Sequence, residues 1–251
     1  MSDYIISENY TLPSGGKLYK EDVNPHIAIR SMTTADEMRR TAHSDLAYAN
    51  LCKVIDDCLV EKPGISSYDM CIGDYVFLLH RLRIVTYGKE YKLSTICPIC
   101  GKQHNTKFNL DELKVNEYTE ELDKYLSIEL PISKKKLALN VMTPRILDSI
   151  SVEQEKLRDR LNDPDGEYTM QLTLSALIDK VDGATLNPIA KETFVKSLPM
   201  MDTNYILKCS EKINEKVGID TSIHLKCTKC KAKYDSHFRI NGEFFSPSID
   251  I

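Results

Sequence analysis

The sequence predicts an α+β protein of two related halves that a shared structural zinc ion joins. Two observations carry this prediction: strand-like and helix-like segments occur in a similar order in both halves, and each half ends with a Cys-x-x-Cys pair. The expected halves are residues 1–125 and 126–251, which form one integrated unit. Each is expected to contain an N-terminal β-hairpin, a helical middle and a terminal zinc-knuckle hairpin.

The composition is that of an ordinary globular protein, because 42% of the 251 residues are hydrophobic and 28% are charged. A net charge of −4 disfavours a general nucleic-acid binder, which usually carries a basic face. No segment approaches the roughly 18 apolar residues of a membrane helix, and the N-terminus, Met1-Ser2-Asp3-Tyr4, lacks the basic and apolar regions of a signal peptide. We therefore expect a cytosolic protein without a membrane partner.

The elements of the first half follow from local signals. Residues 12–19 resemble a strand with a tight glycine turn, and residues 27–30 a second strand. A capping box at 34–37 predicts the start of a helix that runs to Leu59 and ends before Pro63-Gly64.

A second helix is expected from Asp69 to Tyr87, with Gly88 at its C-terminus. Residues 91–110 then predict a β-hairpin with the first cysteine pair at its tip.

The second half repeats this order. Strands are expected at 126–130 and 136–141, and a helix from Pro144 to Leu161, because Thr143 is a suitable N-cap before a proline. Further helices are expected at 167–181, 188–198 and from a cap at Asp202 to Val217. A strand, the second cysteine pair and a last strand near 237–240 complete the chain.

An internal duplication is the hypothesis that these elements favour. A fixed offset of 130 residues without a gap aligns six identical residues and several conservative ones. Chance alignment of two helix–strand–knuckle segments is the alternative. The identical pairs are Met70 with Met200, Tyr75 with Tyr205, Gly88 with Gly218, Cys97 with Cys227, Cys100 with Cys230 and Phe108 with Phe238.

The two cysteine pairs, Cys97 with Cys100 and Cys227 with Cys230, predict one structural Zn²⁺ per chain. Four thiolates complete a tetrahedral zinc site and leave no position for a reactive water. The first knuckle is the stronger signal, because Gly101 permits a positive φ after the second ligand, whereas Lys231 stands at that place in the second.

Other uses of these cysteines remain open but are disfavoured. A thioredoxin-like redox pair needs a helix after the motif, and strand-like residues follow here. An iron–sulfur cluster also takes four cysteines, and disulfides conflict with a cytosolic protein. His104 and His237 lie close enough in sequence to replace a ligand, although an exposed strand residue is the commoner role.

No catalytic motif stands out, so we expect no enzyme and no small-molecule substrate. The chain contains no G-x-S-x-G elbow, no Walker loop, no G-x-G-x-x-G and no His-Glu-x-x-His motif. No pair of carboxylates can be chosen above the background of 37 acidic residues.

Several short motifs occur in order along most of the chain: Leu12-Pro13-Ser14-Gly15-Gly16, Ile29-Arg30, Met32-Thr33, Asp74 to Leu79, Arg83, Gly88, Tyr91, Cys97 to Gly101 and Phe244-Phe245. In these motifs the chain resembles the baseplate hub assembly proteins of T-even-type contractile-tailed bacteriophages. This resemblance implies an assembly factor or minor component of the baseplate hub, which works in the host cytoplasm during assembly, with the virion tail baseplate as a second expected location. Its implied partners are other baseplate hub and tail proteins.

A zinc-ribbon nucleic-acid-binding protein or transcription factor is the alternative function. Its best support is the basic face near Lys226, Lys229, Lys231 and Lys233. At the C-terminal end, Phe244-Phe245-Ser246-Pro247 is either a docking segment or an extension whose phenylalanines pack on the zinc hairpin.

Overall fold

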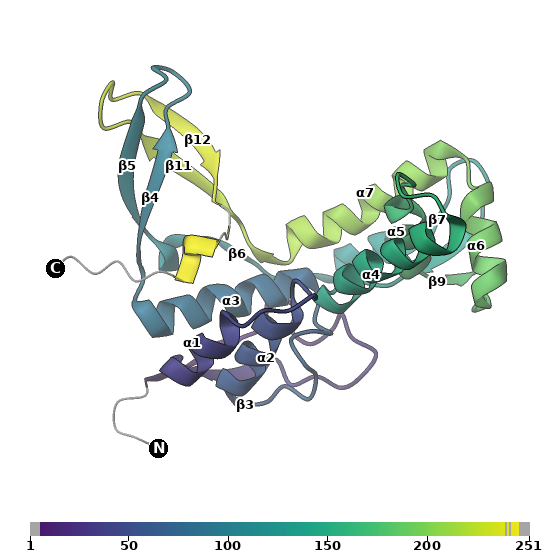
Figure 1. Ribbon diagram of the computed structural model, residues 1–251, viewed down its shortest axis with the longest axis horizontal. Helices are drawn as coiled ribbons and strands as arrows, with labels where there is room; N and C mark the ends of the chain where they lie inside the picture. Colours follow the sequence, from purple (N-terminus) through teal and green to yellow (C-terminus); the bar gives the residue numbers. More distant parts are fainter. Residues whose placement is uncertain (1–5, 239, 241, 246–251) are drawn as a thin grey trace.

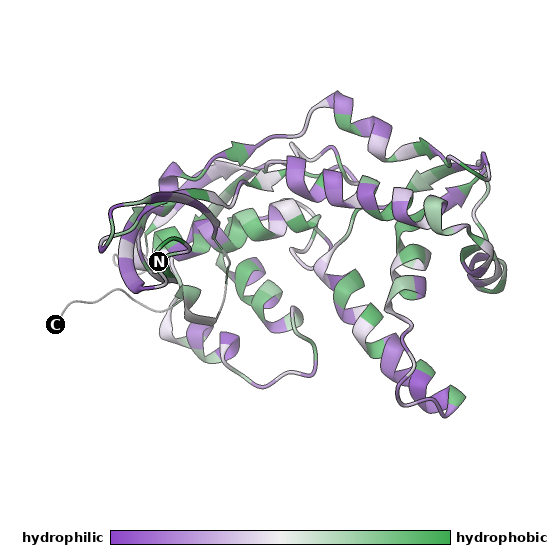
Figure 2. Ribbon diagram, turned by 90° about the horizontal axis from the view of Figure 1, so that it is seen from above, coloured by the Kyte–Doolittle hydropathy of each residue, from purple (hydrophilic) through white to green (hydrophobic). Residues whose placement is uncertain are grey.

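A computed structural model of the chain describes residues 6–238, 240 and 242–245, and it contains both helices and strands, as an α+β fold requires. The protein consists of an elongated body and an arm of two hairpins that rises from one end of the body (Figure 1). Hydrophobic and hydrophilic residues alternate in bands along the helices (Figure 2), as expected where one helix face is buried.

The first sheet contains β1 (Ser7–Thr11), β2 (His26–Arg30) and β3 (Leu59–Glu61) in the order β1-β2-β3. All pairings are antiparallel. Strand β1 precedes the predicted strand at 12–19, which forms a turn instead. Gly16 has a φ of +76° there, and a Cβ at this position would lie 2.4 Å from the Val23 carbonyl oxygen, so the turn closes only around glycine.

The predicted helix from 34 to 59 is wrong in extent, because two helices occupy this segment. These are α1 (Thr34–Arg40) and α2 (Ala49–Cys58), and α2 leads directly into β3. The capping box lies one residue earlier than predicted and joins Thr33 to Asp36. Thr41 ends α1, and its hydroxyl donates to the carbonyl of Glu37, a bond that competes with continuation of the helix.

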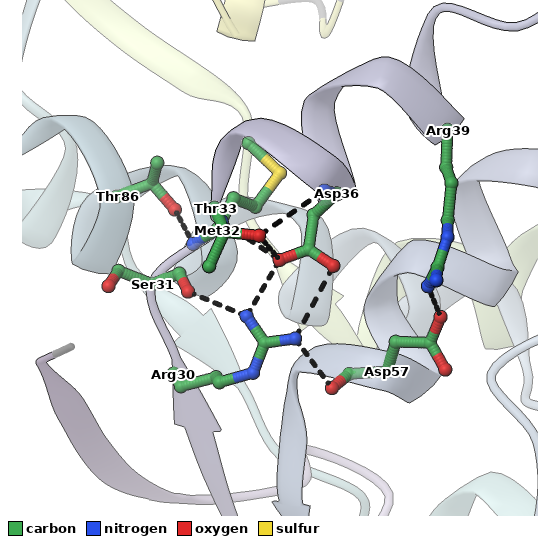
Figure 3. A network of polar contacts seen from close by, with 8 residues as sticks. All are labelled: Arg30, Ser31, Met32, Thr33, Asp36, Arg39, Asp57 and Thr86. Atoms are coloured by element: carbon green, nitrogen blue, oxygen red, sulfur yellow. Dashed lines mark hydrogen bonds and ion pairs between the residues drawn. The ribbon is translucent and has the colours of Figure 1, made fainter. Parts of the chain in front are cut away.

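Arg30 ties the first sheet to both helices (Figure 3). Its guanidinium donates to both carboxylate oxygens of Asp36, at 2.7 and 3.3 Å, and to the Asp57 carbonyl oxygen at the end of α2. Burial alone would raise the pKa of Asp36, but the hydrogen bonds from Arg30 and Thr33 outweigh it and lower the pKa to about 2.

Helix α3 (Ile72–Tyr87) lies at the centre of the body and is buried on most of its surface. It begins three residues after the predicted start and ends, as predicted, at Gly88, whose φ is +81°. Its apolar side chains join those of the first sheet and α2 in the largest core cluster.

The second sheet contains β7 (Ser127–Glu129), β8 (Lys136–Leu139) and β9 (Ile178–Val181), again antiparallel and in the order β7-β8-β9. Helices α4 (Pro144–Leu161) and α5 (Thr169–Leu177) connect β8 to β9, and α5 leads directly into β9. The predicted helix at 167–181 therefore ends early and continues as a strand. Helices α6 (Pro188–Ser197) and α7 (Met200–Lys216) follow.

Both sheets share details beyond their strand order. The register of β2 against β3 shifts between Ala28 and Ile29, and that of β8 against β9 shifts between Ala138 and Leu139. Thr33 and Thr143 then cap the helix that follows in each case.

A buried aspartate near the start of each long helix holds the loop that follows the first strand of each sheet. The amide of Ser14, in Leu12-Pro13-Ser14, donates to Asp74 at 2.9 Å, and the amide of Ile132, in Leu130-Pro131-Ile132, donates to Asp202 at 2.8 Å. Asp74 and Asp202 are each the third residue of their helix. Asp202 is thus not the N-cap of α7, because the helix begins at Met200 after Pro199.

The fixed offset of 130 residues does not align α3 with α7 along their whole length. Asp74 and Asp202 differ by 128 positions, whereas Gly88 and Gly218 differ by 130, because α7 is one residue longer than α3 and Gly218 follows its C-cap Val217. Met70 with Met200 and Tyr75 with Tyr205 are therefore not equivalent pairs.

The arm consists of two antiparallel hairpins, β4–β5 and β11–β12. The strands β6 (Val115–Asn116) and β10 (Gly218–Ile219) pair beneath it, and short 3-10 helices η1, η2 and η3 complete the fold. The bounds of the arm strands and 3-10 helices are β4 Glu90–Ile96, β5 Gln103–Asn109, β11 Ser222–Lys226, β12 Lys233–His237, η1 Leu110–Glu112, η2 Glu120–Tyr125 and η3 Gly242–Phe245.

Gly73 in the first half and Gly218 in the second half lie in close contact. A Cβ on Gly73 in α3 would lie 2.2 Å from the Val217 carbonyl oxygen, and one on Gly218 would lie 2.7 Å from the Cα atom of Gly73. Chain segments from both halves thus pack together beneath the arm. The proposed boundary at residue 125 stays a prediction.

Candidate metal centre

The two Cys-x-x-Cys turns have the same backbone structure. The amide of Gly101 donates to the Cys97 carbonyl oxygen at 2.9 Å, and the amide of Lys231 donates to the Cys227 carbonyl oxygen at 3.0 Å. Gly101 has a φ of +66° and Lys231 a φ of +65°. The lysine thus adopts the left-handed conformation that glycine usually provides, and the second knuckle forms although its sequence signal is weaker.

All four cysteines predicted as ligands meet at the tip of the arm. Their Sγ atoms all lie within 4.8 Å of one another. The distance from Cys97 to Cys230 is 3.7 Å, and that from Cys100 to Cys227 is 3.9 Å. A tetrahedral zinc site with Zn–S bonds of about 2.3 Å has edges of about 3.8 Å, so this group of thiols fits such an ion.

Backbone amides favour the thiolate form of Cys227. The amides of Cys230 and Lys229 both donate to its Sγ atom at 3.4 Å, and they lower its pKa to about 6 although burial opposes this shift. At Cys230, a hydrogen bond from the Ala232 amide is outweighed by burial and by the other thiols, so the pKa is raised. Four thiolates at these distances need a cation between them.

The geometry disfavours a thioredoxin-like redox pair and the two histidines as ligands. Each pair lies between two strands of a hairpin, so the helix that a thioredoxin-like pair needs does not follow either motif. His104 does not belong to the group of close ligand atoms, which among the described residues contains only the four cysteines. Its Nε2 atom lies 2.8 Å from the hydroxyl oxygen of Tyr234 on the other hairpin. His237 lies at the far end of β12 from the thiols, opposite Ser222.

A cluster of aromatic rings supports the arm at its base. Tyr91 contacts Phe108 of its own hairpin and Phe238 and Phe244 from the C-terminal part, with ring centroids 5.3 to 5.8 Å apart. Phe244 and Phe245 are buried and contact each other. Of the two alternatives for this segment, packing on a cysteine hairpin is confirmed for Phe244, whereas Phe245 contacts Phe244 and lies beneath the guanidinium of Arg40 in α1. Ser246 and Pro247 lie outside the described residues.

Arg83 anchors the last described turn, a role that the sequence analysis missed. This fully buried side chain of α3 donates from Nε to the Phe244 carbonyl oxygen at 2.8 Å and from Nη1 to the Gly88 carbonyl oxygen at 2.7 Å. Its guanidinium also lies over the Tyr87 ring. Leu82 and Ile84 flank Arg83, but Arg81 lies on the same helix as a second arginine, so no local signal in the sequence distinguished the buried arginine from the one at Arg81.

Within the described residues, no helix is long and apolar enough to cross a membrane. Comparison with known proteins gives one match to a family: the model described as "T4 bacteriophage base plate protein" matches residues 4–246, which is nearly the whole chain. No curated protein and no solved structure matches the chain.

Proposed function

Because the chain belongs to the T4 bacteriophage base plate protein family, we propose that it is a baseplate hub assembly factor or a minor hub component. Its role is to bind other baseplate hub and tail proteins in the host cytoplasm while the tail is built. The family match along residues 4–246 is the observation that carries this proposal. No enzymatic step and no small-molecule substrate form part of it.

One zinc ion per chain, held by Cys97, Cys100, Cys227 and Cys230, is the second part of the proposal. Distances of 3.7 and 3.9 Å between thiols of opposite hairpins support it. When bound, zinc supplies a rigid cross-link and no reactive site, because its four positions are filled by protein sulfur atoms. Two short hairpins then behave as one stiff arm.

The body is proposed to consist of two halves that arose by duplication. Support comes from the two sheets, with their matching strand order and register shifts, and from the paired aspartates Asp74 and Asp202. Each half contributes one hairpin to the arm from its C-terminal part, so a shared ion joins the two halves there.

Infection with a phage that lacks this chain tests the proposed function. Tails and baseplates from infected cells are separated by sedimentation and viewed by electron microscopy. We expect hub assembly to fail, and we expect the wild-type gene on a plasmid to restore it. Normal yields of complete baseplates without the chain would contradict the proposal. Normal tails with altered viral transcription would favour the nucleic-acid-binding alternative.

A further inference from the structure

The tip of the arm carries two exposed apolar side chains. We define the arm tip as residues 96–102 and 226–233, which include both knuckle turns. Ile96 and Ile99 are 66% and 68% exposed, although isoleucine is a residue that proteins usually bury. Figure 1 shows these turns at the end of the arm, away from the body. Neither isoleucine belongs to a hydrophobic core cluster, so packing within the described chain does not explain why these positions are apolar.

Positive charge surrounds these isoleucines. The arm tip contains five lysines and no acidic residue, in a chain with a net charge of −4. They remain in excess after the net negative charge of a zinc tetrathiolate is subtracted. Among the described residues, no carboxylate forms an ion pair with any of them. They are Lys102, Lys226, Lys229, Lys231 and Lys233.

Two of these lysines face each other across the second hairpin, and their repulsion lowers its stability. Lys226 on β11 is directly opposite Lys233 on β12, and both are exposed. Like charges at directly opposed positions destabilise an antiparallel pair. An acidic partner would relieve this repulsion, so the arrangement suits a surface that binds.

We propose that the arm tip docks on an acidic protein surface, in which an apolar depression receives Ile96 and Ile99 and carboxylates meet the surrounding lysines. This inference rests on the proposed function, because the partner is taken to be another baseplate protein. The two hairpins and the thiol cluster hold the tip in one shape, so little conformational freedom is lost on binding.

A protein fits this tip better than a nucleic acid does. Single strands stack their bases on exposed aromatic rings, and arginine is the preferred side chain for bases and phosphates. The arm tip has neither, and the described rings of Tyr91, Phe108 and Phe238 are packed together at the base of the arm. Exposed isoleucines offer an apolar contact but no platform for stacking.

Two double variants test the docking surface. Ile96→Ser with Ile99→Ser removes the apolar contact, and Lys226→Glu with Lys229→Glu reverses the charge. The second variant also places a glutamate opposite Lys233, so its hairpin is expected to be at least as stable as that of the wild type. Unchanged metal content and melting temperature show that both variants are folded.

Matched controls carry the same changes elsewhere. Ile132→Ser with Ile189→Ser alters two isoleucines that are also exposed, outside the arm. Lys53→Glu with Lys180→Glu reverses two exposed charges on the body.

Binding is measured by interferometry on the full chain. The probes are the other baseplate proteins of the same phage, purified one by one, and random-sequence single-stranded DNA and RNA. We expect wild-type chain to bind at least one baseplate protein, less tightly at higher salt. Both arm-tip variants are expected to lose about tenfold or more in affinity, and the controls to lose little.

The other outcomes separate the two proposals. If the arm-tip variants bind a baseplate protein as well as wild type does, the docking surface is refuted and the proposed function stands. If wild type binds no baseplate protein, both fall. If only DNA or RNA binds, and the charge variant alone loses it, the arm tip is a nucleic-acid site instead.

Discussion

The Sγ atoms of Cys97 and Cys230 lie 3.7 Å apart although 133 residues separate them in the chain. Cys100 and Cys227 form the matching pair at 3.9 Å. Each cysteine thus has its near partner on the other hairpin as well as on its own knuckle turn. An ion bound here closes a loop of more than half the chain, and such a cross-link restricts the unfolded state more than a local one does.

Substitution of one ligand should release the metal. For Cys100→Ser and for Cys230→Ser, we expect loss of bound zinc and a fall of several kcal/mol in the free energy of unfolding, because ligand binding and folding are coupled. Metal content and denaturant unfolding are measured together. Cys209→Ser is the control: this cysteine is buried in the second core, so the variant should lose some stability and keep its metal. Unchanged melting in both ligand variants would refute the clasp.

Gly73→Ala should destabilise the contact beneath the arm by about 3 kcal/mol, because the added Cβ meets backbone atoms that cannot move aside. Helix propensity alone predicts the opposite sign, since alanine favours a helix over glycine. Gly15→Ala is the control: a Cβ at Gly15 would have no atom within 4 Å, and the φ of +59° lies in the left-handed region, so we expect a loss of only about 1 kcal/mol. Equal unfolding free energies for the two variants would contradict this packing.

Arg83→Lys should loosen η3, because lysine cannot donate to the carbonyl oxygens of Phe244 and Gly88 with the fork of a guanidinium. We expect faster hydrogen exchange in the peptide that covers η3 and a loss of about 3 kcal/mol in stability. Arg81→Lys is the control on the same helix, since Arg81 pairs with Asp111 instead. In the Arg81→Lys variant, hydrogen exchange in the peptide that covers η3 should match that of wild type. Faster exchange in both variants would contradict a specific role of Arg83 in holding η3.

Acid should weaken the junction at Asp36. Its pKa is lowered from 3.8 to about 2 in the folded chain, so its contribution is complete above about pH 4 and is lost as the pH falls through about 2. The shift corresponds to about 2 kcal/mol. Urea unfolding across this range should therefore show a steeper loss for wild type than for Asp36→Asn. Parallel pH profiles would show that the ion pair with Arg30 contributes no pH dependence.

The sequence predicted those features whose signal is local. Thr143 before Pro144 caps a helix as expected, and Asn187 does the same before Pro188, since the cap bonds form within three residues. Each knuckle turn likewise depends on a few neighbouring residues. That the two turns meet follows from the number of ligands that zinc requires, which is why the grouping of the thiols was predictable.

Features set by distant contacts were missed. Asp202 resembles a helix cap in sequence, but its carboxylate accepts hydrogen bonds from Ile132 and Ser133, about seventy positions away. The segment from 34 to 59 has helical spacing throughout, yet it breaks after Arg40, and Arg30 joins both of its helices to the sheet. No local pattern encodes these partners.

Native mass spectrometry of the purified chain tests the central claim most directly, because it counts metal ions and chains in one spectrum. We expect a monomer with one zinc ion for the wild type, and a metal-free monomer for Cys230→Ser. Zinc found only in dimers, or a wild-type monomer without metal, would contradict a clasp formed by the two hairpins of a single chain.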